Sequence, residues 1–388
     1  MTRTSASAFS SERHICPSLF FLDHNRIIKN IIAVWSRFIV LMATNNPYEF
    51  FIQWHLTENC NLRCKHCYQG ERNTEELPLT EMKRVVGEVS DMIRDWSDTY
   101  GVAFSPSMNI TGGEPFLKKG LFEFLGESKQ HGFKTYLLTN GTLVSRDRAG
   151  RLRDIGVDGV QVSIEGPEDV HDTIRGKGSF RASTEGIECL VGAKLPVTLN
   201  VTLSAINAST VKQVIAFCAQ VGAQRVGFSR LVPYGQGRSL LSQMLSREQV
   251  RDLYETELSL EYDDIEIVTG DPVASQMREK TNDDAGNVAS SGCSAGVSGL
   301  TILPNGTVMP CRRLPLFIGN VTKDSLREIW STSPVLDALR DRSKYKGRCR
   351  TCNRWAKCRG CRAIAYAYAC SQGLEDFLAE DPQCFIES

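Results

Sequence analysis

The sequence predicts an α/β protein, in which a partial (β/α)6 TIM-like barrel is followed by a small cysteine-rich domain. Strand-like and helix-like stretches alternate from residue 50 to about residue 255. Nearly every polar or glycine-rich cluster follows the carboxyl end of an expected strand, and eight of the 14 cysteines lie between Cys293 and Cys384. Repeated β/α units form a parallel sheet, and a rim that collects loops from many strands is typical of a barrel. Six units instead of the full barrel's eight predict that one side is open.

The six expected strands are short and rich in β-branched or alternating apolar residues. They cover residues 51–56, 107–110, 134–138, 159–164, 197–203 and 225–231. Segments with helical spacing lie between them, at residues 79–96, 120–131, 145–155, 180–193 and 210–221. We expect Ser145 and Ser209 to cap helix N-termini, and Gly132, Gly156 and Gly222 to lie at helix C-termini.

Three cysteines, Cys60, Cys64 and Cys67, lie in the loop that directly follows the first expected strand. Three thiolates so close in sequence can face one centre if the loop wraps around it. A cubane iron–sulfur cluster with three protein ligands leaves one iron open to a small molecule, which makes such a site catalytic. The alternative is a structural zinc site that His66 completes, because zinc usually takes four Cys or His ligands. The spacing favours the cluster and leaves zinc open.

A glycine-rich motif, Gly112-Gly113-Glu114, follows the second expected strand. The two glycines let the backbone approach a ligand closely, and the carboxylate of Glu114 can bind an amino group held near the open iron. The alternative for this motif alone is a tight turn with an exposed acid.

Ser163 and Glu165 close the fourth expected strand, where alternation predicts that both side chains point the same way. A hydroxyl and a carboxylate together suit a ribose diol, although an ordinary polar strand end is the alternative. Arg175, a little further along, can hold a carboxylate with its planar fork of donors. The alternative for Arg175 is an ordinary surface arginine.

The composition is typical of a globular protein, with 41% hydrophobic and 23% charged residues in 388. The formal net charge is zero, so the charge balance gives no support for binding nucleic acid or an anionic membrane. Dense cysteine can indicate a disulfide scaffold, but such scaffolds are usually short secreted chains. Clustered cysteines in a long chain favour metal ligation, and we expect a cytoplasmic protein in a reducing compartment.

We expect four segments: a leader (1–45), the barrel (46–240), a polar connector (241–285) and the cysteine-rich domain (286–388). The leader is expected to be disordered or not translated, because a start at Met42 gives a sensible domain beginning. An amphipathic surface helix is the alternative. The apolar stretch at 27–42 is short for a bilayer span and carries charges, so no membrane span is expected.

The three motifs of the barrel, taken in their order, resemble the radical S-adenosylmethionine (SAM) superfamily over residues 50 to about 240. The resemblance implies a 4Fe–4S cluster on the three-cysteine loop, with SAM on the open iron. It implies reductive cleavage of SAM to a 5′-deoxyadenosyl radical, with the electron supplied by a small flavodoxin- or ferredoxin-type protein. It also implies these SAM contacts: Gly112, Gly113 and Glu114 at the methionine amine, Ser163 and Glu165 at the ribose, His66 beside the adenine, and Asn140 and Arg175 as secondary contacts. Many relatives have Asp where this chain has Glu165.

The C-terminal cysteines resemble the SPASM domain that follows many radical SAM barrels, which implies two auxiliary iron–sulfur clusters. By that resemblance, Cys349, Cys352, Cys358 and Cys384 bind one cluster, and Cys293, Cys311 and Cys361 bind the other. The second set lacks a fourth ligand, and Cys370 is the nearest spare thiol. Paired zinc sites or a disulfide knot are the alternatives from the cysteine pattern alone.

Three functions are compatible with these features. The leading prediction is modification of a ribosomally made peptide, which the SPASM resemblance implies. The second is a tetrapyrrole or haem-biosynthesis enzyme that acts on propionate side chains, because Arg312 and Arg313 directly follow Cys311 and suit carboxylates. The third is a non-catalytic iron–sulfur carrier, against which the intact three-cysteine loop and glycine motif argue.

Overall fold

The computed structural model describes residues 47–70, 75–262, 264–274, 289 and 291–386. The expected leader and the expected boundary near residue 285 lie outside the described residues.

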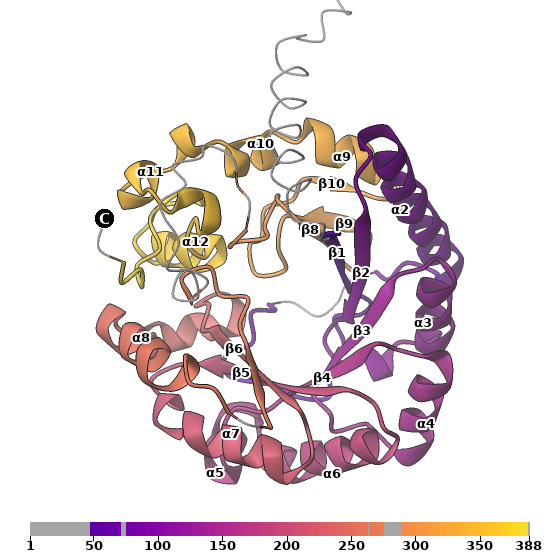
Figure 1. Cartoon of the computed structure of the whole chain (residues 1–388), viewed down its shortest axis with the longest axis vertical. Coiled ribbons are helices and arrows are strands. Elements are labelled where there is room, and N and C mark those ends of the chain that lie inside the picture. The colour runs from indigo at the N-terminus through magenta and orange to yellow at the C-terminus, as the bar shows by residue number, and fades with distance from the viewer. Residues whose placement is uncertain (1–46, 71–74, 263, 275–288, 290, 387–388) are drawn as a thin grey trace, which may run out of the picture.

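A single curved sheet of ten strands forms the centre of the molecule, in the order β10-β9-β8-β1-β2-β3-β4-β5-β6-β7 (Figure 1). Strands β1 to β7 run parallel to their neighbours, β8 is parallel to β1, and β9 and β10 are antiparallel. The order ends at β10 and β7, so the barrel is open, as the sequence predicted. The strands are β1 (Tyr48–His55), β2 (Phe104–Thr111), β3 (Lys134–Thr139), β4 (Gly159–Ser163), β5 (Val197–Leu203), β6 (Arg225–Arg230), β7 (Glu266–Val268), β8 (Gly299–Ile302), β9 (Thr307–Met309) and β10 (Gly319–Asn320).

Helices of the β/α units form the outer layer around this sheet (Figure 1). The helices are α2 (Leu79–Tyr100), α3 (Leu121–Gln130), α4 (Arg146–Ile155), α5 (Glu168–Arg175), α6 (Ser179–Gly192), α7 (Val211–Gln220), α8 (Arg247–Leu253), α9 (Leu326–Thr332), α10 (Pro334–Arg340), α11 (Arg348–Thr351) and α12 (Arg362–Ser371). Ser145 caps α4 as predicted, accepting a hydrogen bond from the Arg148 amide. The predicted cap at Ser209 is wrong, because a short 3-10 turn precedes α7 and makes Thr210 its N-cap.

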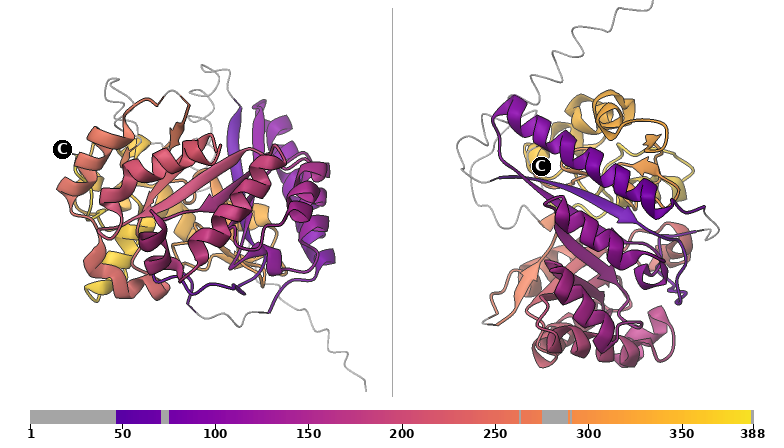
Figure 2. Two further views of the ribbon diagram at one scale, coloured as in Figure 1. Left: turned by 90° about the horizontal axis from the view of Figure 1, so that it is seen from below. Right: turned by 90° about the vertical axis from the view of Figure 1, so that its right-hand side faces the viewer.

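The main core lies between the outer face of the sheet and the helices. Trp54 of β1 packs edge-on against Phe124 of α3, with ring centroids 5.0 Å apart, and α2 crosses the outside of the first strands (Figure 2). The ring centroid of Phe50 lies 5.5 Å from that of Trp96 on α2 and 5.1 Å from that of Trp330 on α9. The cysteine-rich module therefore shares the core of the barrel and continues its sheet through β8.

The inner face of the sheet is polar. Strand β5 alternates buried and half-buried residues along its whole length, so its outward side chains join the core and its inward ones do not. Asn200 and Thr202 of β5, together with Gln161 of β4 and Ser229 of β6, line a pocket inside the barrel. Such a barrel has room for a ligand where a fully packed one has apolar side chains.

Candidate functional site

The pocket lies at the carboxyl ends of β1 to β6 and has a volume of about 910 Å³, including open solvent at its mouth. Its lining contains the predicted residues Cys60, Cys64, His66, Cys67, Gly112, Gly113, Asn140, Ser163 and Arg175, and also Tyr68, Arg312 and Arg313. The predicted residues Glu114 and Glu165 are fully buried outside this lining.

The three-cysteine loop is held in place by backbone hydrogen bonds at both of its sides. The Lys65 amide donates to the Ile174 carbonyl of α5 at 2.9 Å, and the Gly237 amide donates to the Cys67 carbonyl at 3.0 Å. The Gly113 amide donates to the Thr57 carbonyl at 2.7 Å. These bonds fix the loop between the end of β2, the segment after β6 and the end of α5, and all three cysteines line the pocket.

Gly112 and Gly113 are required by the cysteine loop itself. A Cβ on Gly113 would lie 2.2 Å from the Asn59 carbonyl oxygen, and one on Gly112 would lie 2.5 Å from that of Thr57. Gly112 also has a φ of 158°, which is an extended conformation. The sequence predicted a close approach of these glycines to a ligand, whereas the structure shows a close approach to the loop that carries Cys60.

Glu114 joins two loops beneath the pocket. Its carboxylate accepts hydrogen bonds from the Thr139 hydroxyl at 2.8 Å and the Asn140 amide at 2.9 Å. Burial raises the pKa of Glu114 to about 6, and these hydrogen bonds oppose that rise. The alternative of an exposed acid is wrong, because Glu114 is fully buried. Its contact with the methionine amine of SAM stays a prediction.

Glu165 and Arg175 form a buried ion pair. Arg175 donates to Glu165 Oε1 from Nε at 2.9 Å and from Nη2 at 2.5 Å, and the His66 Nε2 lies 3.1 Å from the same oxygen. Burial alone would raise the pKa of Glu165, but Arg175 and then His66 hold it below its usual range. Arg175 is buried, so the surface alternative for it is wrong.

Alternation continues past the last residue of β4, Ser163, because Ile164 is buried in the core. Ser163 lines the pocket, and the Glu165 carboxylate contacts Arg175 and His66, which also line it. Glu165 also accepts a hydrogen bond from the Thr202 amide at 2.9 Å. The contacts of Ser163 and Glu165 with the ribose stay predictions.

The donor set of the loop fits an iron–sulfur cluster. Burial raises the pKa of the Cys60, Cys64 and Cys67 thiols, and a metal that binds a thiol displaces its proton. Within the described ranges, no group of three or more His, Cys, Asp or Glu side chains is arranged to hold a single metal ion. A cubane cluster takes each sulfur at a different iron, so its ligands need not meet at one point.

The C-terminal cysteines fall into two neighbourhoods. Electrostatic interactions link Cys349, Cys358 and Cys384 with one another, and Cys384 with Cys352. Cys361 interacts with Cys293, and Arg313 interacts with both Cys361 and Cys311. The two sets lie next to each other, because the Cys293 amide donates to the Cys358 carbonyl at 3.1 Å. Cys370 lies on α12, where it interacts with Tyr366. No disulfide joins any of the described cysteines.

The sequence interpretation missed His55, at the carboxyl end of β1. Its ring contacts Tyr68 edge-on at 6.0 Å, and both of its buried nitrogens lack a hydrogen-bond partner among the described residues. Burial, and then the charge of Arg312, lower the pKa of His55 to about 3, so the ring is neutral. Alternation along β1 could have found it, because Phe51, Gln53 and His55 share the inward face.

An open barrel with three sulfurs on its carboxyl rim, closed on one side by a cysteine-rich module, defines an iron–sulfur enzyme that activates a small cofactor. Known families agree with that class. Residues 54–218 match the radical SAM superfamily, and residues 293–353 match the SPASM iron–sulfur cluster-binding domain.

Three known proteins illustrate the similarity. The AdoMet-dependent heme synthase of Nitratidesulfovibrio vulgaris is 30% identical over 362 residues, covering 88% of this chain and 94% of that protein. The PqqA peptide cyclase of Methylocella silvestris is 27% identical over 341 residues, covering 85% and 86%. The crystal structure of Streptococcus suis SuiB bound to SAM superposes with a TM-score of 0.68 at 16% identity, covering 92% and 83%.

This chain belongs to the radical SAM superfamily and carries a C-terminal SPASM domain. It is an enzyme whose cofactors are SAM, a SAM-binding 4Fe–4S cluster and auxiliary iron–sulfur clusters. The non-catalytic carrier is therefore set aside. Among the helices that the structure describes, none is both long and apolar enough to cross a bilayer.

Proposed function

We propose that this enzyme acts on a haem-type tetrapyrrole and that Arg312 and Arg313 bind the propionate carboxylates of that substrate. The observation that carries the proposal is that both arginines line the same pocket as Cys60, Cys64 and Cys67. Arginine forks bind carboxylates through paired, charge-assisted hydrogen bonds. A propionate held there would lie in the chamber where SAM reacts.

The surroundings of the two arginines support this role. The Arg312 guanidinium lies over the Tyr68 ring, 5.0 Å from its centroid. The Nε of Arg313 is buried without a hydrogen-bond partner among the described residues. A buried donor without a partner is costly, at about 1–3 kcal/mol. A substrate carboxylate would satisfy that donor.

The comparison with known proteins adds weight to a tetrapyrrole. The heme synthase relative is more similar to this chain than the peptide cyclase is, at 30% against 27% identity over comparable lengths. The peptide-modifying relative keeps a second candidate function open, namely modification of a ribosomally made peptide, which the sequence interpretation ranked first. The experiment below separates the two.

We assign the residues of the SAM site as follows. Cys60, Cys64 and Cys67 hold the cluster. The residues that face SAM on the pocket wall are Gly112, Gly113, Asn140, Ser163, His66 and Arg175. The buried Glu114 and Glu165 position these groups from beneath. When bound, the cluster and SAM supply a 5′-deoxyadenosyl radical that abstracts a hydrogen atom. A small reductant protein of the flavodoxin or ferredoxin type supplies the electron. The polar barrel wall orients the substrate. The Tyr68 side chain, which also lines the pocket, helps to exclude water.

We assign the auxiliary clusters to the two cysteine neighbourhoods. Cys349, Cys352, Cys358 and Cys384 hold one cluster, and Cys293, Cys311 and Cys361 hold the other. The electrostatic neighbourhoods described above support this division.

The test compares iron coproporphyrin III, which carries a propionate on every pyrrole ring, with its methyl ester. Binding is followed by the porphyrin absorbance, and turnover by release of 5′-deoxyadenosine under anaerobic, reducing conditions. We expect tight binding of the free acid and loss of binding for the ester. Arg312→Gln or Arg313→Gln should weaken binding about tenfold or more, because a hydrogen bond to a charged group contributes about 1.5–3 kcal/mol.

Substrate-free cleavage of SAM should be unchanged in both variants. The exposed Arg238, whose guanidinium lies 5.5 Å from the Tyr234 ring centroid, provides the control variant Arg238→Gln, which should bind like the wild type. If the porphyrin neither binds nor stimulates cleavage while a precursor peptide does, the tetrapyrrole function is wrong and the peptide function replaces it.

A further inference from the structure

Arg230, the last residue of β6, joins three distant segments of the chain inside the protein. Its side chain is fully buried. Nε and Nη2 donate to Asp271 at 2.5 and 2.9 Å, and Nη2 and Nη1 donate to Asp381 at 2.8 and 3.1 Å. Nη1 also donates to Gln383 Oε1 at 3.0 Å. All five N–H donors of the guanidinium are therefore satisfied.

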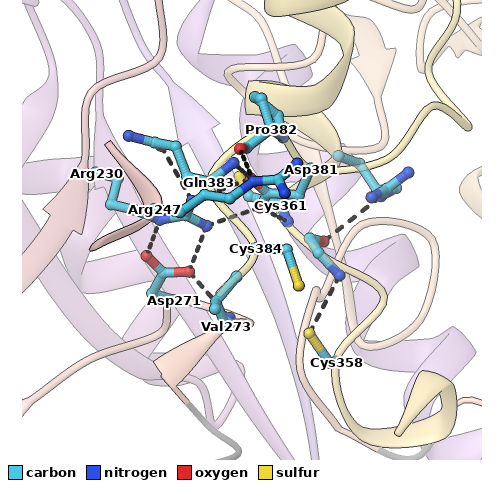
Figure 3. Close-up of polar contacts among 12 residues, drawn as sticks. Arg230, Arg247, Asp271, Val273, Cys358, Cys361, Asp381, Pro382, Gln383 and Cys384 are labelled. Carbon is cyan, nitrogen blue, oxygen red and sulfur yellow. Dashed lines mark hydrogen bonds and ion pairs between the residues drawn. The ribbon is translucent and has the colours of Figure 1, made fainter. Parts of the chain in front are cut away.

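Asp381 forms hydrogen bonds with the backbone of one cysteine from each C-terminal group, Cys361 and Cys384 (Figure 3). Its Oδ2 accepts a hydrogen bond from the Cys361 amide at 2.8 Å, and its carbonyl oxygen accepts one from the Cys384 amide at 3.1 Å. Its Oδ1 accepts from the Gln383 amide at 3.0 Å. One aspartate thus contacts a cysteine of each auxiliary site through the backbone, and its carboxylate is bound at four positions.

Asp271 completes the network on the barrel side, and among the described residues it forms no hydrogen bond with a cysteine. Its carboxylate accepts from the Tyr254 hydroxyl at 2.9 Å and from the Val273 amide at 3.1 Å. The chain on both sides of Arg230 reaches the pocket, because Ser229 of β6 and Val232 just after β6 line it. The network therefore connects the pocket wall with the segment that carries Cys384.

We propose that Asp381, fixed by Arg230 of the barrel, is a positioning residue for both auxiliary iron–sulfur sites. A buried network in which every donor and acceptor is satisfied holds its members in a single arrangement. This arrangement orients the Cys361 backbone and the turn that ends at Cys384, and it holds both against the barrel. The inference rests on the ligand sets proposed above and is independent of the tetrapyrrole substrate.

Stability alone does not account for such a network. Replacing buried ionic groups by apolar residues of similar volume is often neutral or stabilising. Asp381 differs from Asp271 in one respect that matters for the clusters, because Asp381 contacts the cysteine backbone. The two aspartates therefore form a matched pair: each binds Arg230 through both of its oxygens, and one of them contacts the cysteines.

The experiment compares Asp381→Asn with Asp271→Asn in the full reconstituted chain. In Asp381→Asn the amide NH2 would face two donors: one N–H of Arg230 and either the Gln383 amide or the Cys361 amide, depending on which oxygen it replaces. A second set of the same variants also carries alanine at Cys60, Cys64 and Cys67, so that their spectra report the auxiliary clusters alone. Readouts are iron and sulfide per chain, the electron paramagnetic resonance (EPR) spectrum of the reduced protein and circular dichroism.

We expect Asp381→Asn to keep its secondary structure and its SAM-cluster signal but to alter the auxiliary EPR signals and to hold about four to eight fewer irons, as cubanes have four each. Asp271→Asn should lower the melting temperature and keep the auxiliary signals. The control Arg225→Gln removes the exposed ion pair between Arg225 and Glu266 at the other end of β6. It should leave the iron content, the EPR signals and the melting temperature unchanged.

Unchanged auxiliary signals in Asp381→Asn would overturn the inference. The same loss in Asp271→Asn, or unfolding of Asp381→Asn with disappearance of the SAM-cluster signal, would also overturn it, because either result assigns the network to overall stability.

Discussion

The guanidinium group of Arg175 lies between the carboxylate of Glu165 and the sulfur of Cys64. Its Nη1 is 3.7 Å from Cys64 Sγ, while Nε and Nη2 bind Glu165. Helix α5, which ends at Arg175, therefore places one positive charge against both the cluster loop and the end of β4. This charge favours the thiolate that an iron would bind and offsets the charge of a buried carboxylate.

Removal of Arg175 should destabilise the protein strongly, because it leaves Glu165 buried without its cation. We expect Arg175→Met to lower the free energy of unfolding by about 3–5 kcal/mol, measured by urea denaturation. The double variant Arg175→Met/Glu165→Gln should recover part of that loss. The control Arg153→Met, which removes an exposed pair with Asp154, should change the free energy by less than about 1 kcal/mol. Equal effects of the two single variants would contradict this account of the Arg175 pair.

Gly113 should be intolerant of any side chain, because the cysteine loop occupies the space that a Cβ would need. We expect Gly113→Ala to displace the loop, and the reconstituted protein to lose most of its SAM-cluster iron and its SAM cleavage. Gly126 of α3 is the matched control, since nothing lies within 4 Å of a Cβ added there. Gly126→Ala should stabilise the helix by roughly 0.5–1 kcal/mol. Full iron content in Gly113→Ala would show that the close approach is not required.

His55 should make stability depend on pH. The unfolded histidine binds a proton below about pH 6.5, whereas the pKa of folded His55 is lowered to about 3 by burial and then by Arg312. As the pH falls from 6.5 toward 3, the unfolded state binds more protons, so stability declines by about 1.4 kcal/mol per pH unit. His55→Phe should weaken this decline and raise the melting temperature at pH 6. His131→Phe, at a partly exposed histidine, is the control, and a steeper acid decline in His55→Phe would contradict the assignment.

Cys370 should not be a cluster ligand. It interacts with Tyr366 on its own helix, and the described interactions of Cys293 and Cys361 do not include this spare thiol. Cys370→Ser should therefore keep about 12 irons per chain, the content of three cubanes. Cys361→Ser should lose about four of them. Equal loss in both variants would make Cys370 a ligand.

Local patterns in the sequence predicted much of the fold. Each of the first six strands was located because short apolar stretches alternate with helical segments, and Gly156 does end α4 in the left-handed conformation. The pairing of β8 with β1 could not be predicted in this way. The residues of the two strands are far apart in sequence. For example, the Tyr48 hydroxyl donates a 2.7 Å hydrogen bond to the Val297 carbonyl, 249 residues away. No local pattern encodes such a register.

The candidate site was predicted to a similar extent. Residue type and spacing identified the cysteine loop, because the chemistry of a cluster needs thiolates close in sequence. The partners of Glu165 could not be identified from the sequence. They depend on the eight-residue helix α5, whose C-terminal end lies against the three-cysteine loop. The network of Arg230 was missed for the same reason: its two aspartates lie 41 and 151 residues away.

The most direct test of the proposed function uses iron coproporphyrin III deuterated at its propionate carbons. The account predicts that 5′-deoxyadenosine formed by the reduced enzyme gains deuterium from this substrate. It also predicts that a propionate of the porphyrin loses its carboxyl group as CO2 and becomes a vinyl group, while an auxiliary iron–sulfur cluster would accept the remaining electron. Formation of 5′-deoxyadenosine without deuterium, at the same rate with and without the porphyrin, would contradict it.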